Sequence, residues 1–286
     1  MFEEKPVTNY KPVLRWAGGK SWVLPVVNQL VKIIAKDGAI TGNYHEPFFG
    51  GGAVFFYLKA KNYLMGKSYL SDLNDELVVS YKFLKRNPDE LLHELYKLSN
   101  DKDTYYQVRS SKPSTSLGVA TRFFYLNRTS FNGIYRVNLK NEYNVPYGNK
   151  KYKILFEEKR YYDVSELLQR TFLSKGDFSK ILSKLSKNDL VFLDPPYTVA
   201  HENNGFVKYN QNIFSWEDQV RLRDLCFEIS RIGAYFILTN ASHSSIDELY
   251  EKCGRRMLLQ RPSVIGGKKA KRGTINELLF TNIPKK

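Results

Sequence analysis

A short apolar run that is followed by an aspartate and two prolines is the feature of this sequence that most constrains its fold. Leu190–Leu193 is apolar throughout, and Asp194-Pro195-Pro196-Tyr197 follows it without a break. A short apolar run bounded by turn residues is typical of a buried strand. Because the residue before a proline is pushed into extended backbone, the chain cannot coil into a helix here. We therefore predict a buried strand that carries the Asp194 carboxylate at its carboxyl end.

The same strand end indicates a chemistry. The exocyclic amine of a nucleobase is a poor nucleophile, because its lone pair is delocalised into the ring until hydrogen-bond acceptors localise it. Asp194 offers a carboxylate and Pro195 a carbonyl as acceptors, and neither proline brings a competing N–H. We predict methyl transfer to such an amine, helped by positioning and electrostatic stabilisation, with a catalytic site made of Asp194, Pro195, Pro196 and Tyr197. The alternative is a proline-stiffened strand exit with a solvated aspartate, and the rest of the chain must decide.

The charge of the chain favours a polyanionic partner. Lysine and arginine total 44 against 29 aspartate and glutamate residues, which gives a net charge of +15. Residues 109–153 concentrate this charge, because nine of them are basic and only Glu142 is acidic. Nucleic acid is therefore the first candidate partner. A basic surface that contacts only solvent is the alternative.

The sequence gives little indication of a metal site, a membrane-spanning segment or a signal peptide. Cys226 and Cys253 match no metal-ligand spacing and the four histidines are scattered, so we expect no metal site. So few cysteines suit a reducing compartment, although a single pair does not exclude a disulfide. No apolar stretch approaches the ~20 residues that cross a membrane, and the N-terminus lacks the apolar core of a signal peptide. We expect no membrane contact and a location in the bacterial cytoplasm.

Short apolar runs alternate with helical patterns, as in a mostly parallel sheet with helices between its strands. We expect a doubly wound, Rossmann-like α/β domain formed by residues 1–74 and 158–286. Between these segments, residues 75–157 are helical, basic and aromatic, and we expect them to form an inserted, mainly helical domain. The turn residues Asn132-Gly133 and residues 134–147 predict a hairpin inside this insertion.

A glycine-rich turn marks the cofactor half of the expected sheet. The segment Glu46-Pro47-Phe48-Phe49-Gly50-Gly51-Gly52 follows a strand pattern and opens a helix, where the backbone can approach a ligand and attract an anion. Asp72 comes 20 residues after Gly52, and its carboxylate can accept both ribose hydroxyls of an adenosine-containing cofactor. The turn departs from the GxGxxG dinucleotide fingerprint, which favours S-adenosylmethionine. A tight structural turn is the alternative.

Two further stretches are candidates for the same cofactor. Lys20, behind Gly18, can pair with the cofactor carboxylate while Trp16 packs beside it. Asp177 and Phe178 can border the cofactor adenine. A flexible basic turn and an ordinary strand-end turn are the respective alternatives. The predicted cofactor-binding residues are Trp16, Ala17, Gly18, Lys20, Glu46, Pro47, Phe48, Gly50, Gly52, Asp72, Asp177, Phe178 and Asp194.

Seven segments together carry a family resemblance: KPVLRWAGGK, HEPFFGGGAVFF, LSDLND, FFYLNRTSFNGIYRVNLKNEYNVPYG, FLDPPY, FVKYNQNIFSWEDQ and INELLF, in that order. On these segments, residues 11–280 closely resemble the Dam-type DNA adenine-N6 methyltransferases. They match the α class, in which the cofactor motif precedes the recognition insertion and the DPPY motif follows it. The resemblance implies S-adenosylmethionine as donor and a flipped adenine of double-stranded DNA as acceptor. The cofactor contacts that it implies are Trp16, Lys20, Asp72 and Asp194, and Asp194 with Tyr197 also holds the adenine.

The insertion resembles the hairpin with which this family reads GATC. By that resemblance, Phe131 wedges or stacks in the duplex and Arg136 reads a guanine through its two major-groove acceptors. Arg15 stands where a base- or phosphate-contacting lysine is usual, and Pro146 where a residue packs near a thymine methyl. The predicted DNA-binding residues are Arg15, Asn127, Arg128, Phe131, Asn132, Ile134, Arg136 and Pro146. Without the resemblance, a core phenylalanine, a plain turn and a solvated arginine are the alternatives.

Departures from the family pattern leave the target sequence more open than the chemistry. Ser130, Phe131 and Val137 differ from the common spellings, and residues 268–272 lengthen a late basic loop. The rivals are an adenine methyltransferase with another DNA target, an RNA adenine methyltransferase, a cytosine-amine DNA enzyme, and a non-catalytic DNA-binding protein. Residues 207–214 follow the catalytic motif, and we expect them to order over the base. A restriction endonuclease that acts on the same site, without direct contact, is a further partner left open.

Overall fold

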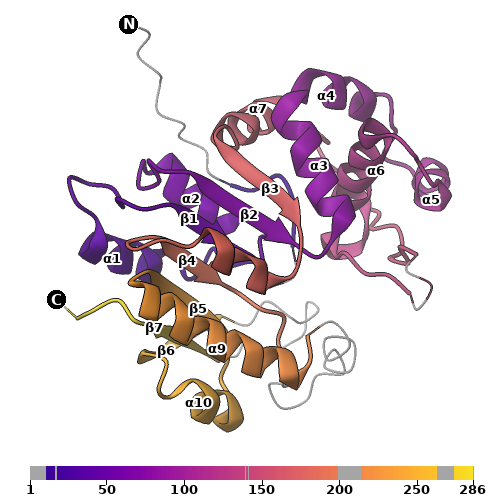
Figure 1. Ribbon diagram of the computed structural model, residues 1–286. Coiled ribbons are helices and arrows are strands. Elements are labelled where there is room, and N and C mark those ends of the chain that lie inside the picture. The colour runs from indigo at the N-terminus through magenta and orange to yellow at the C-terminus, as the bar shows by residue number, and fades with distance from the viewer. Residues whose placement is uncertain are drawn as a thin grey trace, which may run out of the picture. The chain divides into compact units, whose positions relative to one another are not determined.

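Seven strands of the described residues form one sheet (Figure 1). The computed structural model describes residues 11–16, 18–138, 140, 142–198, 214–262 and 274–285. The order of the strands in the sheet is β3-β2-β1-β4-β5-β7-β6. The strands are β1 (Tyr44–Glu46), β2 (Ser68–Asp72), β3 (Thr171–Lys175), β4 (Leu190–Leu193), β5 (Tyr235–Ala241), β6 (Arg255–Pro262) and β7 (Thr274–Thr281).

The central strands are parallel, and the winding of the sheet reverses beside β1. β1 pairs in parallel with β2 and β4, and β4 pairs in parallel with β5. β7 runs antiparallel to its neighbours β5 and β6. Strands β2 and β3 follow β1 on one side and β4 and β5 lie on the other, so the predicted doubly wound α/β fold is confirmed. Open sheets of this kind bind ligands beyond the carboxyl ends of the strands at the point of reversal.

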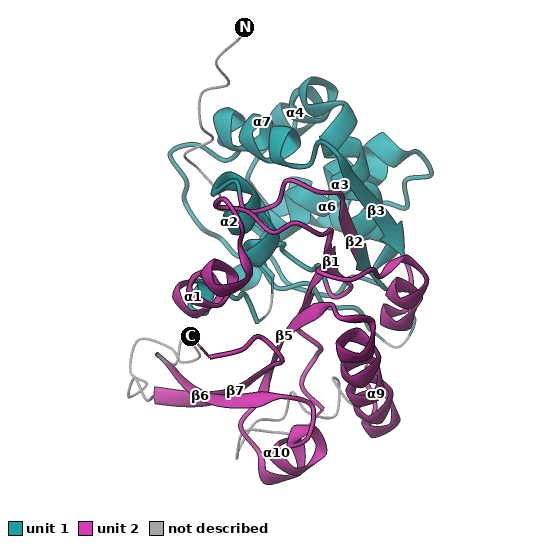
Figure 2. Cartoon of the chain, turned by 60° about the vertical axis from the view of Figure 1, so that its left-hand side comes forward, with its two compact units in different colours: residues 1–24, 49–62, 71–175 teal, residues 25–48, 63–70, 176–286 magenta. Residues whose placement is uncertain are grey.

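The chain divides into two compact units, which Figure 2 distinguishes by colour. The first unit holds residues 1–24, 49–62 and 71–175, and the second holds residues 25–48, 63–70 and 176–286. The predicted insertion, residues 75–157, falls within the first unit, and so do the glycine turn and Asp72. The boundaries of a recognition domain at residues 75 and 157 stay a prediction, because a compact unit does not define a functional boundary.

The first unit is mainly helical. Helix α3 (Asp75–Arg86) is capped by Asn74, whose side chain accepts from the N–H of Leu77 and so satisfies a free donor of the first turn. Helix α3 packs against α6 (Figure 1), and the buried rings of Tyr81 and Phe124 meet edge to face at 6.2 Å. The helices of this unit are α2 (Ala53–Ala60), α3 (Asp75–Arg86), α4 (Pro88–Tyr96), α5 (Lys102–Ser110), α6 (Ser116–Thr129) and α7 (Glu158–Leu167).

The second unit has its core between its helices and strands β4, β5 and β7. Helix α9 begins with a capping box between Ser215 and Asp218 and ends at Gly233, which has the left-handed φ of 83° typical of a helix end. Leu222 of α9 packs in one buried cluster with Val191 of β4, among other apolar side chains. The helices are α1 (Leu24–Ile34), the 3₁₀ helix η2 (Phe178–Lys184), α9 (Trp216–Ile232) and α10 (Ser244–Tyr250).

The predicted hairpin is present in the first unit, but its turn lies later than Asn132-Gly133. The N–H of Asn138 donates to the carbonyl of Glu142 at 2.9 Å, and antiparallel bridges join the two arms. The Asn138 side chain accepts from the N–H groups of Lys140 and Glu142 and so closes the turn itself. Asn132-Gly133, with positive φ at both residues, belongs to the short 3₁₀ helix η1 (Phe131–Gly133), which lies in the first arm between the bridges at Ser130 and Val137.

Candidate active site and DNA interface

The carboxyl end of β4 holds the Asp194 carboxylate. All four residues of β4 are buried, and Asp194, half-buried, follows directly. Thr239 lies on the neighbouring strand β5, one residue beyond the partner of Leu193. The Thr239 hydroxyl donates to Asp194 Oδ1 at 2.8 Å. This hydrogen bond restricts rotation of the carboxylate, as a positioned acceptor requires.

Two different elements hold the residues that follow Asp194. The Tyr197 hydroxyl donates to Glu277 Oε2 on β7. The next side chain, Thr198, accepts from Gln219 Nε2 on α9 at 3.0 Å and donates to the carbonyl of Phe214 at 3.1 Å. Gln219 and Glu277 are both buried. The predicted catalytic motif is therefore anchored by side chains from distant parts of the sequence.

The residues at the end of β1 lie in the same unit as this motif. Glu46 is buried and accepts from the Tyr44 hydroxyl at 2.7 Å. Burial, and then the charge of Glu46, raises the pKa of Tyr44 well above its usual value. Pro47 is buried as well. Phe48 stacks on Phe178 at a centroid distance of 5.4 Å, so the structure brings these two predicted cofactor residues together.

Asp177 begins η2 and is held by its neighbours. Its Oδ1 accepts from the N–H of Ser179 at 3.0 Å and pairs with Arg221 at 2.7 Å. Burial raises the pKa of Asp177, but the hydrogen bonds from Ser179 and Arg221 outweigh burial and lower the pKa below its usual value. The Arg221 guanidinium also lies over the Phe178 ring, at 4.8 Å. Asp177 and Phe178 thus belong to one cluster in the second unit.

In the first unit, the glycine turn is tied to Asp72. Asp72 Oδ2 accepts from the N–H of Gly50 and Oδ1 from the N–H of Asn74, each at 2.9 Å. Burial raises the pKa of Asp72, and these backbone hydrogen bonds offset part of that shift. Gly50 has a φ of +46°, and a Cβ added there would lie 2.6 Å from Trp16 Cδ1. The close approach of the Trp16 ring therefore requires glycine at this position.

The other predicted cofactor residues of the first unit are Gly52, Lys20, Gly18 and Ala17. A Cβ at Gly52 would lie 2.5 Å from the Phe49 ring, so Gly52 is required by packing as well as by its φ of +70°. Lys20 is buried, and its Nζ donates to the carbonyl of Gly18 at 2.9 Å. Ala17 lies outside the described residues. Of the predicted cofactor residues in this unit, Trp16, Gly50 and Asp72 are therefore linked through the glycine turn, by the close packing of Trp16 on Gly50 and the hydrogen bond from Gly50 to Asp72.

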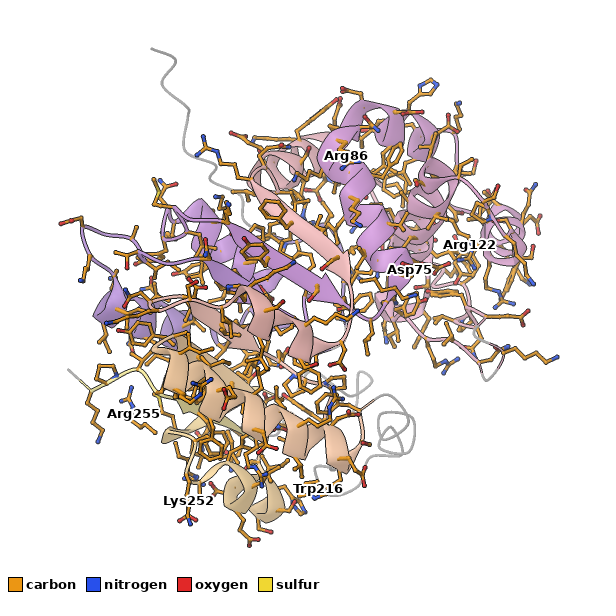
Figure 3. The ribbon with its side chains drawn as sticks, viewed as in Figure 1. Asp75, Arg86, Arg122, Trp216, Lys252 and Arg255 are labelled. Atoms are coloured by element: carbon orange, nitrogen blue, oxygen red, sulfur yellow. The ribbon has the colours of Figure 1, made fainter. Side chains whose placement is uncertain are left out.

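Tyr135, which the sequence did not single out, joins the hairpin to Trp16. The two rings stack at 5.5 Å with an interplanar angle of 24°. The Tyr135 hydroxyl donates to Glu76 Oε2 at 3.1 Å, and burial, followed by the Glu76 charge, raises its pKa. Arg122 of α6 (Figure 3) pairs with Glu76 Oε1 at 3.0 Å. The hairpin is thus fixed to the tryptophan that packs on the glycine turn.

Several predicted DNA-binding side chains are exposed. Phe131 is 51% exposed, although a large apolar ring is usually covered. Its N–H donates to the carbonyl of Pro146 at 2.9 Å, which brings these two exposed residues together. Arg136 is exposed, and its Nε donates to Asn144 Oδ1 at 2.7 Å. Arg15 and Asn132 are exposed and Ile134 is half-buried.

Two predicted DNA-binding residues make structural contacts. Asn127 is buried; its Oδ1 accepts from the Arg15 N–H, and its Nδ2 donates to the carbonyls of Arg15 and Gly133. The amide therefore holds the backbone of Arg15 beside the start of the hairpin. Arg128 donates from Nε to the carbonyl of Leu155 at 2.7 Å. A role of Asn127 and Arg128 in DNA binding stays a prediction, and Asn127 would act through the backbone that it holds.

Comparison with known proteins identifies the chain. The family model of the D12 class N6 adenine-specific DNA methyltransferases matches residues 16–262, which include the glycine turn, the hairpin and Asp194. The chain belongs to this family. The methyltransferase is 34% identical to the type II methyltransferase M1.LlaDCHI of Lactococcus lactis subsp. cremoris, over 98% of each chain. It is 35% identical to the type II methyltransferase M.MjaIII of Methanocaldococcus jannaschii, over 95% of this chain and 99% of that one.

A third relative agrees with the family. The DNA adenine methylase of Escherichia coli K12 is 28% identical, over 93% of both chains. The predicted family and activity are confirmed, so the protein is an adenine-specific DNA methyltransferase. Membership of a methyltransferase family implies that S-adenosylmethionine is the donor and DNA the substrate.

Some sequence predictions fall outside the described residues. They concern residues 207–213 and the basic loop 268–272, whereas Phe214 is described and is buried against Phe48. Within the part of the chain that the structure describes, no three His, Cys, Asp or Glu side chains form a group that could hold a metal ion. None of the helices found there combines the length and apolarity of a membrane span. Cys226 and Cys253 are both buried and are not joined.

Four residues of the site were missed by sequence reasoning: Thr239, Glu277, Gln219 and Tyr135. Glu277 did leave a signal, because it is an acidic residue directly before the apolar run of residues 278–280. Tyr135 lies between two predicted DNA contacts, Ile134 and Arg136, and this position was a signal that it could belong to the site. For Thr239 and Gln219 no local pattern distinguishes the residue from its neighbours.

Proposed function

We propose that this methyltransferase transfers a methyl group to N6 of an adenine that has been flipped out of double-stranded DNA, within GATC. S-adenosylmethionine, when bound, would supply the methyl group, and its sulfur would retain the electron pair of the broken C–S bond. The adenine nitrogen uses its lone pair for the new N–C bond and afterwards loses one proton to solvent water. The observation that carries the proposal is the Asp194 carboxylate, held by Thr239 at 2.8 Å at the end of β4.

The proposed catalytic roles follow from the acceptors at that strand end. Asp194 and the carbonyl of Pro195 accept from the adenine amine and localise its lone pair, and neither Pro195 nor Pro196 adds an N–H that would compete. Tyr197 stacks on the flipped base. Flipping costs a few kcal/mol, and contacts of the basic insertion with phosphates offset this cost.

The proposed cofactor residues provide groups that fit an adenosine-containing methyl donor. In the first unit, each Asp72 oxygen accepts one backbone N–H and has capacity for a further donor, such as a ribose hydroxyl. Lys20 suits the carboxylate of the donor, and Trp16 an apolar contact. In the second unit, Phe48, Asp177 and Phe178 are proposed to border the adenine. Phe178 is buried, so it would act by backing the half-buried Phe48 ring on which it stacks. The remaining proposed contacts are Ala17, Gly18, Glu46, Pro47, Gly50 and Gly52.

The exposed residues of the hairpin support a role in reading the DNA. An apolar wedge such as Phe131 can enter a disturbed base stack, and Arg136 can bond both major-groove acceptors of a guanine. Arg15, Asn132, Ile134 and Pro146 are proposed to contact bases or backbone beside them. Because two relatives are named type II methyltransferases, we also propose a cognate restriction endonuclease that acts on the same site without contacting this chain.

The test compares methylation of defined duplexes. Duplexes that contain GATC, and variants with one altered base, are incubated with tritium-labelled S-adenosylmethionine, and the modified base is identified after digestion. We expect N6-methyladenine, formed fastest on GATC. Equal rates on all duplexes, or a preference for another sequence, would refute the GATC target while the chemistry stands. Label in cytosine, or in RNA in preference to DNA, would refute the proposed reaction.

A further inference from the structure

Glu277 lies outside the catalytic motif, and we propose that it is a positioning residue for this reaction, holding the Tyr197 ring in the plane in which it stacks on the flipped adenine. The Tyr197 hydroxyl donates to Glu277 Oε2. Glu277 is 1% exposed and sits on β7, opposite Ala241 of β5. The inference rests on the proposed function, because it takes the stacking role of Tyr197 from there.

The burial of Glu277 argues against a role in stability alone. Removing a carboxylate from water carries a desolvation cost that its partners must offset, and an apolar residue of similar size is often at least as stable in such a place. The next four residues of β7, residues 278–281, are all buried, and three of them are apolar. An apolar residue at position 277 would extend that buried run. A carboxyl group in this buried position that is hydrogen-bonded to the proposed catalytic motif points to a role in the site.

The geometry also explains why a tyrosine hydroxyl needs an anchor. A ring that stacks on a base must stay parallel to that base. Rotation about the side-chain bonds of an unanchored tyrosine would turn its ring out of this orientation. The hydrogen bond to Glu277 fixes the far end of the Tyr197 ring. Thr198, the next residue, is fixed separately through Gln219 of α9, and Gln219 in turn accepts from Asn240 and Tyr250. The backbone on one side of Tyr197 and its ring are thus held from two different elements, which is the preorganisation that positioning requires.

Three variants test the proposal on the full-length enzyme. Glu277→Ala removes the acceptor, Tyr197→Phe removes only the donor and keeps the ring, and Glu277→Gln keeps an acceptor of the same size. The control is Glu248→Gln, which changes an exposed carboxylate on α10. For each variant, kcat and the KM for duplex DNA are measured, and circular dichroism checks the fold. Because Tyr197→Phe leaves the buried carboxylate in place, it carries the test even if Glu277→Ala does not fold.

We expect Glu277→Ala and Tyr197→Phe to lower kcat by a similar factor, about tenfold to a hundredfold, as for loss of a hydrogen bond to a charged group. KM for DNA should change less than about twofold, because binding of the duplex does not depend on the ring plane. Glu277→Gln should recover most of kcat, and the double variant should be no worse than either single one, since both changes remove one interaction.

Other outcomes separate the inference from the function on which it rests. A wild-type kcat in Tyr197→Phe, a multiplicative loss in the double variant, or a Glu277→Gln enzyme as slow as Glu277→Ala would each overturn the positioning role. Tyr197→Ala distinguishes a failure of the proposed stacking role of Tyr197 from a failure of the positioning role of Glu277. If it turns over normally, the stacking role in the proposed function is wrong. If it is inactive while Tyr197→Phe is fully active, only the role of Glu277 is wrong.

Discussion

Truncating Tyr135 should weaken binding of S-adenosylmethionine, although Tyr135 lies in the hairpin and is not among the proposed cofactor contacts. Its ring stacks on Trp16 at 5.5 Å, and Trp16 packs so closely on Gly50 that a Cβ there would lie 2.6 Å from the indole. Gly50 donates in turn to the Asp72 carboxylate. Removing the Tyr135 ring leaves one face of Trp16 uncovered, so Trp16 and the turn beneath it become less restricted.

The size of the effect follows from the contacts that are lost. An aromatic pair contributes about 0.5–1.5 kcal/mol beyond the area that it buries, and 1.4 kcal/mol corresponds to tenfold in affinity. Tyr135→Ala should therefore raise the Kd for S-adenosylmethionine by roughly threefold to tenfold. The hydrogen bond to Glu76 adds little to this effect, because the Glu76 side chain is 37% exposed.

Tyr135→Phe is the matched control, since it keeps the ring on Trp16 and removes only the hydroxyl. Its affinity for the cofactor should stay within about twofold of that of the wild type. The assay is calorimetry with S-adenosylmethionine in the absence of DNA, so that any contact of the hairpin with DNA is irrelevant. An unchanged Kd in Tyr135→Ala, measured beside an Asp72→Ala variant that does lose affinity, would refute the path through Trp16. An equal loss in Tyr135→Phe would assign the effect to Glu76 instead of the ring stack.

Three further predictions concern the proposed site. Asp194→Ala should abolish methyl transfer and leave DNA binding largely intact, and near-normal turnover in this variant would refute the acceptor role. Thr239→Val, which removes the 2.8 Å hydrogen bond to Asp194, should lower kcat by about tenfold. Burial raises the pKa of Asp72, so its contribution to folding stability is lost as pH rises from the usual aspartate range through the raised value. Ribose hydroxyls donate to the ionised form, so S-adenosylmethionine should bind more tightly as pH rises through the same window, whereas Asp72→Asn should show no such dependence in calorimetry. Arg136→Ala should slow methylation of GATC more than methylation of duplexes in which the guanine of that site is altered, by the equivalent of about 1–3 kcal/mol. Equal slowing on every duplex, with a weaker salt dependence of DNA binding, would indicate a phosphate contact instead.

Local patterns predicted the parts of the molecule whose conformation is decided locally. The run Leu190–Leu193 and the two prolines after it were sufficient to predict the strand and the place of Asp194, because burial and proline geometry act within a few residues. The partners of that strand end could not be found in this way. Thr239 is 45 residues from Asp194 and Glu277 is 80 residues from Tyr197, and only the sheet order brings them together.

The hairpin shows a similar limit on a smaller scale. Asn-Gly is a strong turn signal, and it predicted a turn at residues 132 and 133. Both residues do have positive φ, but the chain reverses at Asn138, whose side chain accepts two backbone N–H groups. Turn propensity identified residues that tolerate unusual backbone angles. It could not decide which of two asparagines closes the hairpin, because that depends on which arms can pair.

The interleaving of the two units also gives the growing chain an order of assembly. All three segments of the first unit lie before residue 176, so the unit that carries the hairpin is fully synthesised while β4, which carries the proposed catalytic motif, is still missing. β1 belongs to the second unit and is made early, yet Leu190 and Val191, which pair with Tyr44 and His45, emerge much later. Since chains generally fold from the N-terminus during synthesis, β1 must wait with one unpaired edge, which is a site where strands of other chains can attach. The ribosome-bound intermediate therefore presents the residues proposed to read DNA before the strand end proposed for methyl transfer has been made.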